Sequence, residues 1–177
     1  MKHYTFTPKQ LIHSTSPAEI ADEQGQCVGY LQRYYANRLQ RAADILLDNW
    51  FVHVKVEEAA GSTNVCARQL WTWGRPKWEL TIERGGDSDT SDCLLTDKTR
   101  IKTHPRFQYD KAGRSYTFAK NLLDRKTYCY RGESSDCFAD ITYDHPVVKG
   151  MRTVTVYEEE LHPFEIIACY RLMDLVY

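Results

Sequence analysis

Aromatic and cationic side chains alternate in the stretch WTWGRPKW, which begins at Trp71. In an extended chain Trp71 and Trp73 share one face, and Trp78 follows a turn that carries Arg75 and Lys77. Amphipathic rings beside cations suit a membrane interface or a phosphorylated headgroup. We therefore predict Trp73, Arg75, Lys77 and Trp78 as ligand-binding residues. The plainer alternative, which we favour for this stretch taken alone, is a set of core tryptophans beside a solvated turn.

A second group of cations lies in TDKTRIKTHPRF. In an extended chain Lys98, Arg100 and Lys102 fall on one face, and Arg106 follows closely. Three cations on one strand face can hold phosphate oxygens, so these four residues are also predicted to bind a ligand. The plainer alternative here is a solvated face whose charge is balanced by the acidic loop GGDSDTSD.

Residues for catalysis or metal binding do not form a recognisable pattern. The histidines stand apart without H-E-x-x-H spacing, and no G-x-S-x-G, P-loop or G-x-G-x-x-G motif is present. His53 and Lys55 occupy the polar face of an alternating strand, where we expect solvent exposure. The sequence predicts no enzyme activity, no cofactor and no metal site.

Length and composition limit the remaining classes of protein. A chain of 177 residues is predicted to form one domain, residues 1–177. Lys and Arg total 23 against 24 Asp and Glu, and this near-neutral balance argues against a dedicated nucleic-acid binder. We find no signal peptide and no transmembrane segment, so a cytoplasmic location is expected, with peripheral membrane contact as an option. The six scattered cysteines are then expected to be reduced thiols.

Short extended runs account for most of the chain. About a dozen are separated by turns, which indicates a mainly β sandwich or barrel. The run QLIHSTS counts among the strands, whereas GGDSDTSD is predicted to be a loop with a mobile tip. One short amphipathic helix is predicted near residues 37–48 from the spacing of its leucines and alanines; whether residues 29–36 are strand or helix stays open. Arg33, Arg38 and Arg41 would form a solvated row on that helix.

The closing segment LHPFEIIACYRLMDLVY predicts a helix without a polar stripe. A helix lying on the outside of a sheet would show one wet face. A barrel of a dozen strands encloses more space than its own side chains fill. We therefore predict that the helix runs through a closed antiparallel barrel of about twelve strands.

Three features carry a resemblance to a known family: the strand–turn–strand EIADEQGQCVGYLQR, the helix ANRLQRAADILL and the closing apolar helix. Together with the succession of strands, they make the chain similar to the tubby C-terminal-like superfamily of tubby domains, phospholipid scramblases and LURP-one-related proteins, including small single-domain bacterial members. The resemblance implies a twelve-stranded barrel around the C-terminal helix. Tubby domains bind phosphoinositide headgroups through a basic surface pocket; the resemblance assigns no individual binding residue here.

The leading hypothesis is a non-enzymatic binding domain for an anionic phospholipid headgroup or another phosphorylated ligand. The alternative is a protein-interaction or structural domain without a small-molecule site. The two hypotheses differ in whether the cations of the two stretches meet on one surface.

Overall fold

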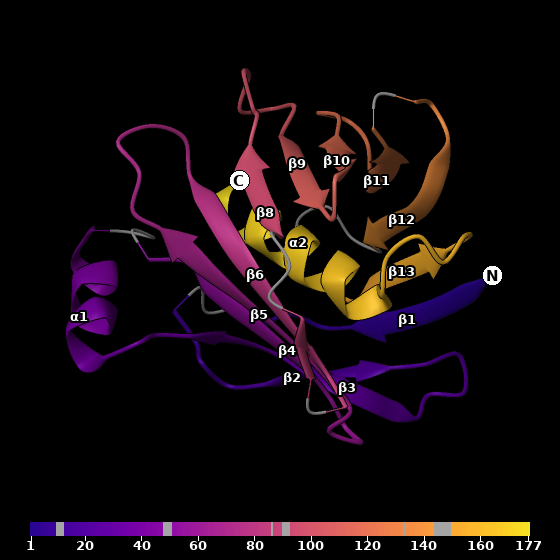
Figure 1. Ribbon diagram of the computed structural model, residues 1–177, viewed down its shortest axis with the longest axis horizontal. Coiled ribbons are helices and arrows are strands. Elements are labelled where there is room, and N and C mark those ends of the chain that lie inside the picture. Colours follow the sequence, from indigo (N-terminus) through magenta and orange to yellow (C-terminus); the bar gives the residue numbers. More distant parts are fainter. Residues whose placement is uncertain (10–12, 48–50, 86, 90–92, 133, 144–149) are drawn as a thin grey trace.

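Twelve antiparallel strands form a closed barrel around the C-terminal helix, as predicted (Figure 1). The computed structural model describes residues 1–9, 13–47, 51–85, 87–89, 93–132, 134–143 and 150–177. Its two helices are α1, Arg38–Leu47, and α2, Pro163–Val176. The strands are β1 Lys2–Phe6, β2 Ala18–Ala21, β3 Cys27–Tyr34, β4 His53–Glu58, β5 Thr63–Leu70, β6 Lys77–Arg84, β7 Asp87–Asp89, β8 Leu94–Asp97, β9 Arg106–Lys111, β10 Arg114–Lys120, β11 Lys126–Arg131, β12 Cys137–Tyr143 and β13 Arg152–Val156.

The strand order around the barrel is β5-β4-β3-β2-β1-β13-β12-β11-β10-β9-β8-β6. Pairing of β5 with β6, from Thr63 opposite Arg84 to Leu70 opposite Lys77, closes the ring. The short strand β7 pairs only with the far end of β6 and stands outside the ring. Closure leaves the twelve barrel strands without an unpaired edge, which removes a template for aggregation.

Helix α2 fills the barrel interior. Its side chains are buried all the way round, including Ile166, Ile167 and Leu172, which have no exposed surface. They meet the inward faces of the strands, for example Val54 and Val56 of β4. The helix begins after His162, whose Nδ1 accepts a hydrogen bond of 3.3 Å from the Phe164 N–H. The predicted apolar helix is therefore the centre of the core.

One carboxylate lies inside this core, at the first turn of α2. Glu165 has no exposed surface and accepts hydrogen bonds from Lys111 Nζ at 2.7 and 2.8 Å, Tyr109 Oη at 3.0 Å and Arg84 Nη2 at 3.1 Å. The helix dipole also favours a negative charge at this turn. These partners compensate for the desolvation of a charge that would otherwise be severely unfavourable.

Gly29 of β3 is required by the packing of α2. A Cβ at this position would lie 2.6 Å from the Glu57 carbonyl oxygen and 2.8 Å from the Phe164 ring. The turn before β3 uses a different property of glycine, because Gly25 adopts a φ of +75°. The strand–turn–strand predicted around Asp22–Gly25 is thus confirmed, and each of its two glycines has its own physical reason.

Three local predictions were wrong. QLIHSTS was predicted as a strand; its first three residues lie outside the described part, and 13–17 are not in a strand. The loop predicted at GGDSDTSD contains β7, because Asp87–Asp89 pairs with β6. Arg33 does not belong to a helical row: it lies on β3, and its guanidinium is buried against Asp44 at 2.7 Å.

His53 was predicted to be exposed but is buried. The rings of Tyr34 and Phe51 lie beside it, with centroids at 5.3 and 6.4 Å, and its Nδ1 accepts a hydrogen bond from the Gln69 N–H at 2.9 Å. Burial, together with nearby cations, lowers the pKa of His53 to about 4, so the ring is neutral at pH 7. The alternation along β4 gave the wrong result because this outer face is covered by side chains of its neighbours.

Removal of α2 should abolish folding. Each buried side chain such as Ile167 or Leu172 contributes roughly 1.5–3 kcal/mol, and the sum over the helix exceeds the ~5–15 kcal/mol net stability of a typical domain. A chain truncated after Glu160 should therefore be unfolded or insoluble, and Ile167→Asp should behave almost as badly. Circular dichroism and proton NMR measure this; a dispersed spectrum from residues 1–160 would contradict the threaded helix.

Gly29→Ala should lower the stability by about 1–3 kcal/mol, because the added methyl group overpacks the contact between β3 and α2. Gly74→Ala is the matched control, since a Cβ there meets no atom within 4 Å. Urea unfolding of both variants gives the comparison. Equal stability of the two variants would show that the close approach at Gly29 is not a constraint.

Candidate functional site

The connections that carry the predicted binding residues meet at one end of the barrel, where α2 ends. Lys77 pairs with Thr96, which places the β5–β6 connection, residues 71–76, beside the β8–β9 connection, residues 98–105. Ala119 pairs with Arg106, which adds the β10–β11 connection, residues 121–125. Helix α1 joins β3 to β4 at the same end (Figure 1).

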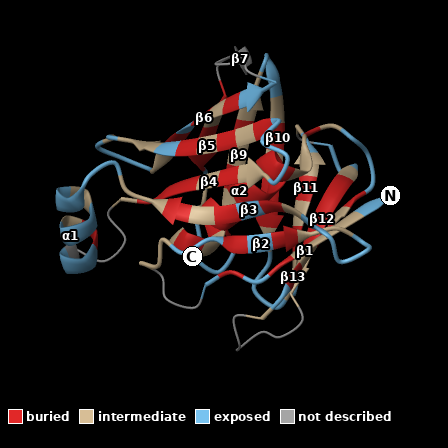
Figure 2. Cartoon of the chain, turned by 90° about the horizontal axis from the view of Figure 1, so that it is seen from below, coloured by how far each residue is buried: buried red, intermediate tan, exposed pale blue. Residues whose placement is uncertain are grey.

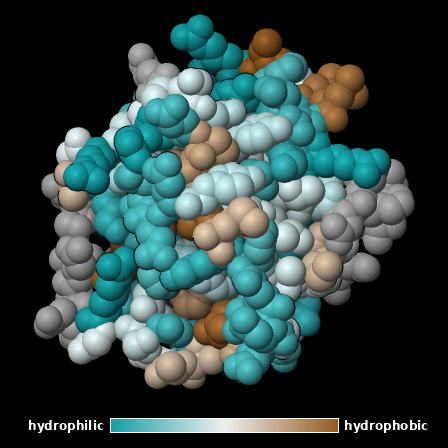
Figure 3. Space-filling view, turned by 90° about the vertical axis from the view of Figure 1, so that its right-hand side faces the viewer, coloured by the Kyte–Doolittle hydropathy of each residue, from teal (hydrophilic) through white to brown (hydrophobic). Residues whose placement is uncertain are grey.

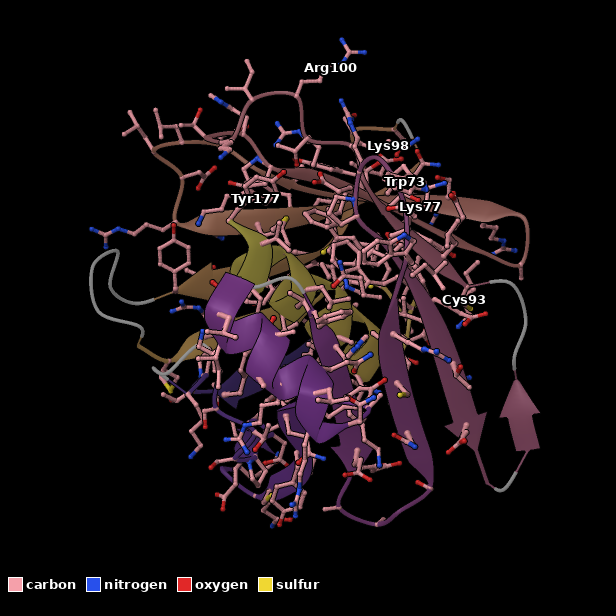
Figure 4. The ribbon with its side chains drawn as sticks, turned by 90° about the vertical axis from the view of Figure 1, so that its left-hand side faces the viewer. Trp73, Lys77, Cys93, Lys98, Arg100 and Tyr177 are labelled. Carbon is pink, nitrogen blue, oxygen red and sulfur yellow. The ribbon has the colours of Figure 1, made fainter. Side chains whose placement is uncertain are left out.

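The two cation-bearing stretches are neighbours. The Asp97 N–H donates to the Pro76 carbonyl at 3.1 Å, which extends the β6–β8 pairing beyond Lys77 and brings Arg75 close to Lys98 along the register. Figure 4 shows Trp73, Lys77 and Lys98 in one group, with Arg100 projecting beyond them. The β6–β8 register and Figure 4 both place residues from the two stretches on one surface.

Asp97 fixes the start of the 98–105 connection. This buried carboxylate accepts hydrogen bonds from the Thr99 N–H at 2.8 Å and from the Tyr177 hydroxyl at 2.8 Å. Burial, and after it the hydrogen bond to Asp97, raises the pKa of Tyr177 above the ordinary tyrosine value, which keeps its hydroxyl a hydrogen-bond donor. The last residue of the chain therefore ties the helical core to the cationic loop.

The 98–105 connection is not the straight strand on which its prediction was based. It turns, with a hydrogen bond from the His104 N–H to the Ile101 carbonyl at 2.8 Å. Lys98 and Arg100 still line one groove of about 390 Å³, together with Arg106 and the apolar Ile101 and Phe107. Lys102 is exposed in the same connection but does not line the groove.

Arg106 has a structural role in this groove. Its Nη1 donates to the Lys120 carbonyl at 2.6 Å and to the Pro105 carbonyl at 3.0 Å, and its Nη2 donates to Asn121 Oδ1 at 2.8 Å. The guanidinium thus joins the 98–105 and 121–125 connections. It contributes positive charge to the groove while holding its walls together.

Trp78 does not belong to the surface. It is fully buried, its indole N–H donates to the Val52 carbonyl at 2.8 Å, and its ring packs against Phe107. The structural alternative is correct for this tryptophan. It is wrong for Trp71 and Trp73, which lie beyond the end of β5 and are 66% and 98% exposed.

Exposed cations at this end share a lack of ion-pair partners within the described residues. We call the set the basic end: Arg38, Arg41, Arg75, Lys98, Arg100, Lys102 and Arg125. The acids that the structure describes in the same four segments are Asp44, which is buried, and Asp124, which is half-buried and accepts a hydrogen bond from the Lys126 N–H. Asp97, which precedes Lys98, is buried and bonded to Thr99 and Tyr177, so no described carboxylate forms an ion pair with the cations of the basic end.

At the opposite end three consecutive glutamates are paired with cations. Glu159 lies 2.5 Å from Lys2, Glu158 lies 3.1 Å from Arg131, and Glu160 contacts Arg131 and Arg114. The face on the side away from α1 is mostly hydrophilic, with scattered hydrophobic residues (Figure 3). A chain with a net charge of −1 thus has a basic end whose described cations lack acidic partners.

Apolar side chains lie among the cations of the basic end. In the β8–β9 and β10–β11 connections these are Ile101, Leu122 and Leu123, which are 62%, 58% and 95% exposed. Sequence reasoning missed Leu122 and Leu123, although an Asn-Leu-Leu-Asp turn between two strands was a visible signal. Cations beside exposed apolar side chains can hold an anionic phosphate at an apolar interface. No helix within the described part of the chain has the length and apolar character needed to cross a membrane.

Comparison with known proteins identifies the family. A family model described as Tubby C-terminal like domain matches residues 4–177. No curated protein and no solved structure gives a significant match. The match spans the end of β1, all later strands, both helices and the connections of the basic end. The chain therefore belongs to the Tubby C-terminal like domain family.

Proposed function

We propose that this protein is a non-enzymatic binding module that recognises anionic phosphate headgroups through its basic end and docks peripherally on an anionic membrane. The observation that carries the proposal is the meeting of exposed cations from four separate connections without carboxylate partners among the described residues. Family membership adds support, since tubby domains bind phosphoinositides. A cytoplasmic location, facing an anionic leaflet, belongs to the same proposal.

Electrostatics gives this surface a useful affinity. Each Lys or Arg close to an anionic leaflet contributes about 1 kcal/mol, so several together reach a micromolar range that remains reversible. Arg75, Lys98 and Arg100 come from two adjacent connections and can approach one headgroup together. The binding should weaken with salt, because the charges are exposed.

Charge reversal tests the proposal. The variant Arg75→Glu with Arg100→Glu should reduce co-sedimentation with phosphatidylserine-containing vesicles at least about tenfold at low salt, while the melting temperature stays within a few degrees. Lys2→Glu with Arg114→Glu is the matched control: it changes the net charge equally at the opposite end, on side chains that are 58% and 73% exposed.

Further arms identify the ligand. Vesicles with a phosphoinositide, vesicles of phosphatidylcholine alone and a soluble inositol phosphate separate a lipid from a free phosphate. Binding of the soluble phosphate alone would assign a free ligand to the site. Absence of binding to every anionic vesicle at low salt, or equal loss in the matched control, would overturn the proposal.

A further inference from the structure

Helix α1 is attached to the barrel through a polar residue. Asp44 has no exposed surface and accepts hydrogen bonds from Arg33 Nη2 at 2.7 Å, Tyr35 Oη at 2.7 Å and the Phe51 N–H at 2.8 Å. His13 Nδ1 lies 2.9 Å away on the remaining side. Burial acts to raise the pKa of Asp44, but these hydrogen bonds and the charge of Arg33 outweigh it and lower the pKa. The anchor is therefore a charged carboxylate at pH 7.

The apolar stripe of α1 faces away from that anchor. Successive helical residues are rotated by about 100°, which puts Leu39 and Leu46 on one line and Asp44 roughly 140–160° away. The two leucines are 80% and 83% exposed, and Ala42 between them is exposed as well. In Figure 2 most of α1 is exposed, and its buried part faces the barrel. An amphipathic helix ordinarily buries its apolar stripe, so the orientation of α1 is the reverse of the usual one.

The helix does not depend on this stripe for its fold. Asn37 caps the first turn, with its Oδ1 accepting from the Gln40 N–H at 2.8 Å, and Gln40 Oε1 accepts from the Ala36 N–H at 2.9 Å. The caps and the Asp44 anchor fix the helix and its orientation. The exposed side chains of Leu39 and Leu46 are therefore available for contact with a surface outside the described chain.

The surroundings of α1 indicate what covers the stripe. Arg38 and Arg41 are exposed on the more polar side of α1: at 100° per residue, Arg38 lies about 80–100° and Arg41 about 140–160° from the two leucines. Their long side chains can extend toward phosphates beside a buried apolar stripe. A groove of about 570 Å³ separates α1 from the 71–76 connection; Gln40 lines one side, and Trp71 and Trp73 line the other. Leucine, tryptophan and arginine in this arrangement are typical of helices that lie in a membrane interface. A protein partner would need no cations on the helix and the neighbouring connections, whereas an anionic bilayer supplies both the apolar layer and the opposite charge.

We propose that α1 is an interfacial helix, which inserts Leu39 and Leu46 into the acyl boundary of an anionic bilayer while Trp73 enters beside it. The inference rests on the proposed function and adds to it: docking combines electrostatic attraction with apolar insertion. Screening by salt weakens only the first component. Membrane binding should therefore retain a salt-resistant part.

The test measures vesicle co-sedimentation at low and at high salt, about 50 mM and 500 mM. We expect the wild-type chain to retain part of its binding at high salt. Leu39→Gln with Leu46→Gln should remove this salt-resistant part, so that binding at high salt falls at least about tenfold. Leu39→Trp with Leu46→Trp should keep it, because tryptophan also inserts into a membrane interface. The added indoles should also show fluorescence quenching by brominated lipids. Tyr30→Trp, on the barrel wall at a position that is 38% exposed, is the control and should gain no quenching.

Each other outcome contradicts the inference in a distinct way. Absence of wild-type binding at both salt concentrations would remove the proposed function and the inference together. Wild-type binding at low salt that is lost completely at high salt would keep the headgroup site and overturn the insertion. Binding at low salt that the glutamine variant shares fully with the wild type would keep the headgroup site and overturn the insertion. A wild-type dimer that the glutamine variant converts to monomer, measured by analytical ultracentrifugation, would assign the stripe to a second copy of the chain instead.

Discussion

The interior of a closed twelve-stranded barrel is wider than its own side chains can fill, and α2 is the solution to that constraint. The constraint explains why the helix is apolar on every side and why Gly29 leaves room for Phe164. It also explains the partners of Glu165, because a carboxylate in such a core is tolerated only when Tyr109 and Lys111 reach it. With its interior occupied, the barrel is left with its outer surface and its two ends for function.

Periodicity gave the architecture, because burial in a barrel imposes a regular pattern on the chain. The strands and the closing helix were predictable since each has an apolar repeat set by one uniform environment. Trp78 and Trp73 show where this reasoning ends. Both are tryptophans of one stretch, yet Trp78 is in the core and Trp73 is 98% exposed, because Trp73 lies in the connection after β5 and Trp78 lies on β6, which begins at Lys77. Where a strand ends depends on its pairing with strands that are distant in the sequence, and the local residue pattern does not determine it.

The site was predictable only in part for the same reason. The cations of the two stretches were found from their types, whereas their meeting depends on the register between β6 and β8. Leu122, Leu123 and the stripe of α1 were not assigned to the site, because an apolar residue is normally read as core. The reversed orientation of α1 depends on Asp44, whose partners Arg33, Tyr35 and Phe51 come from outside the helix.

The distribution of charge along the barrel has a consequence for kinetics. The exposed cations of the basic end belong to a chain whose formal net charge is −1, so the rest of the chain carries the compensating negative charge and the molecule has a permanent electric dipole. A dipole in the field of a charged surface experiences a torque before any contact is made. In the proposed docking on an anionic membrane, the molecule would rotate during diffusion and arrive with α1 and the cationic connections leading. Productive encounters would then be more frequent than random collision allows, and the opposite end of the barrel would point back into solution.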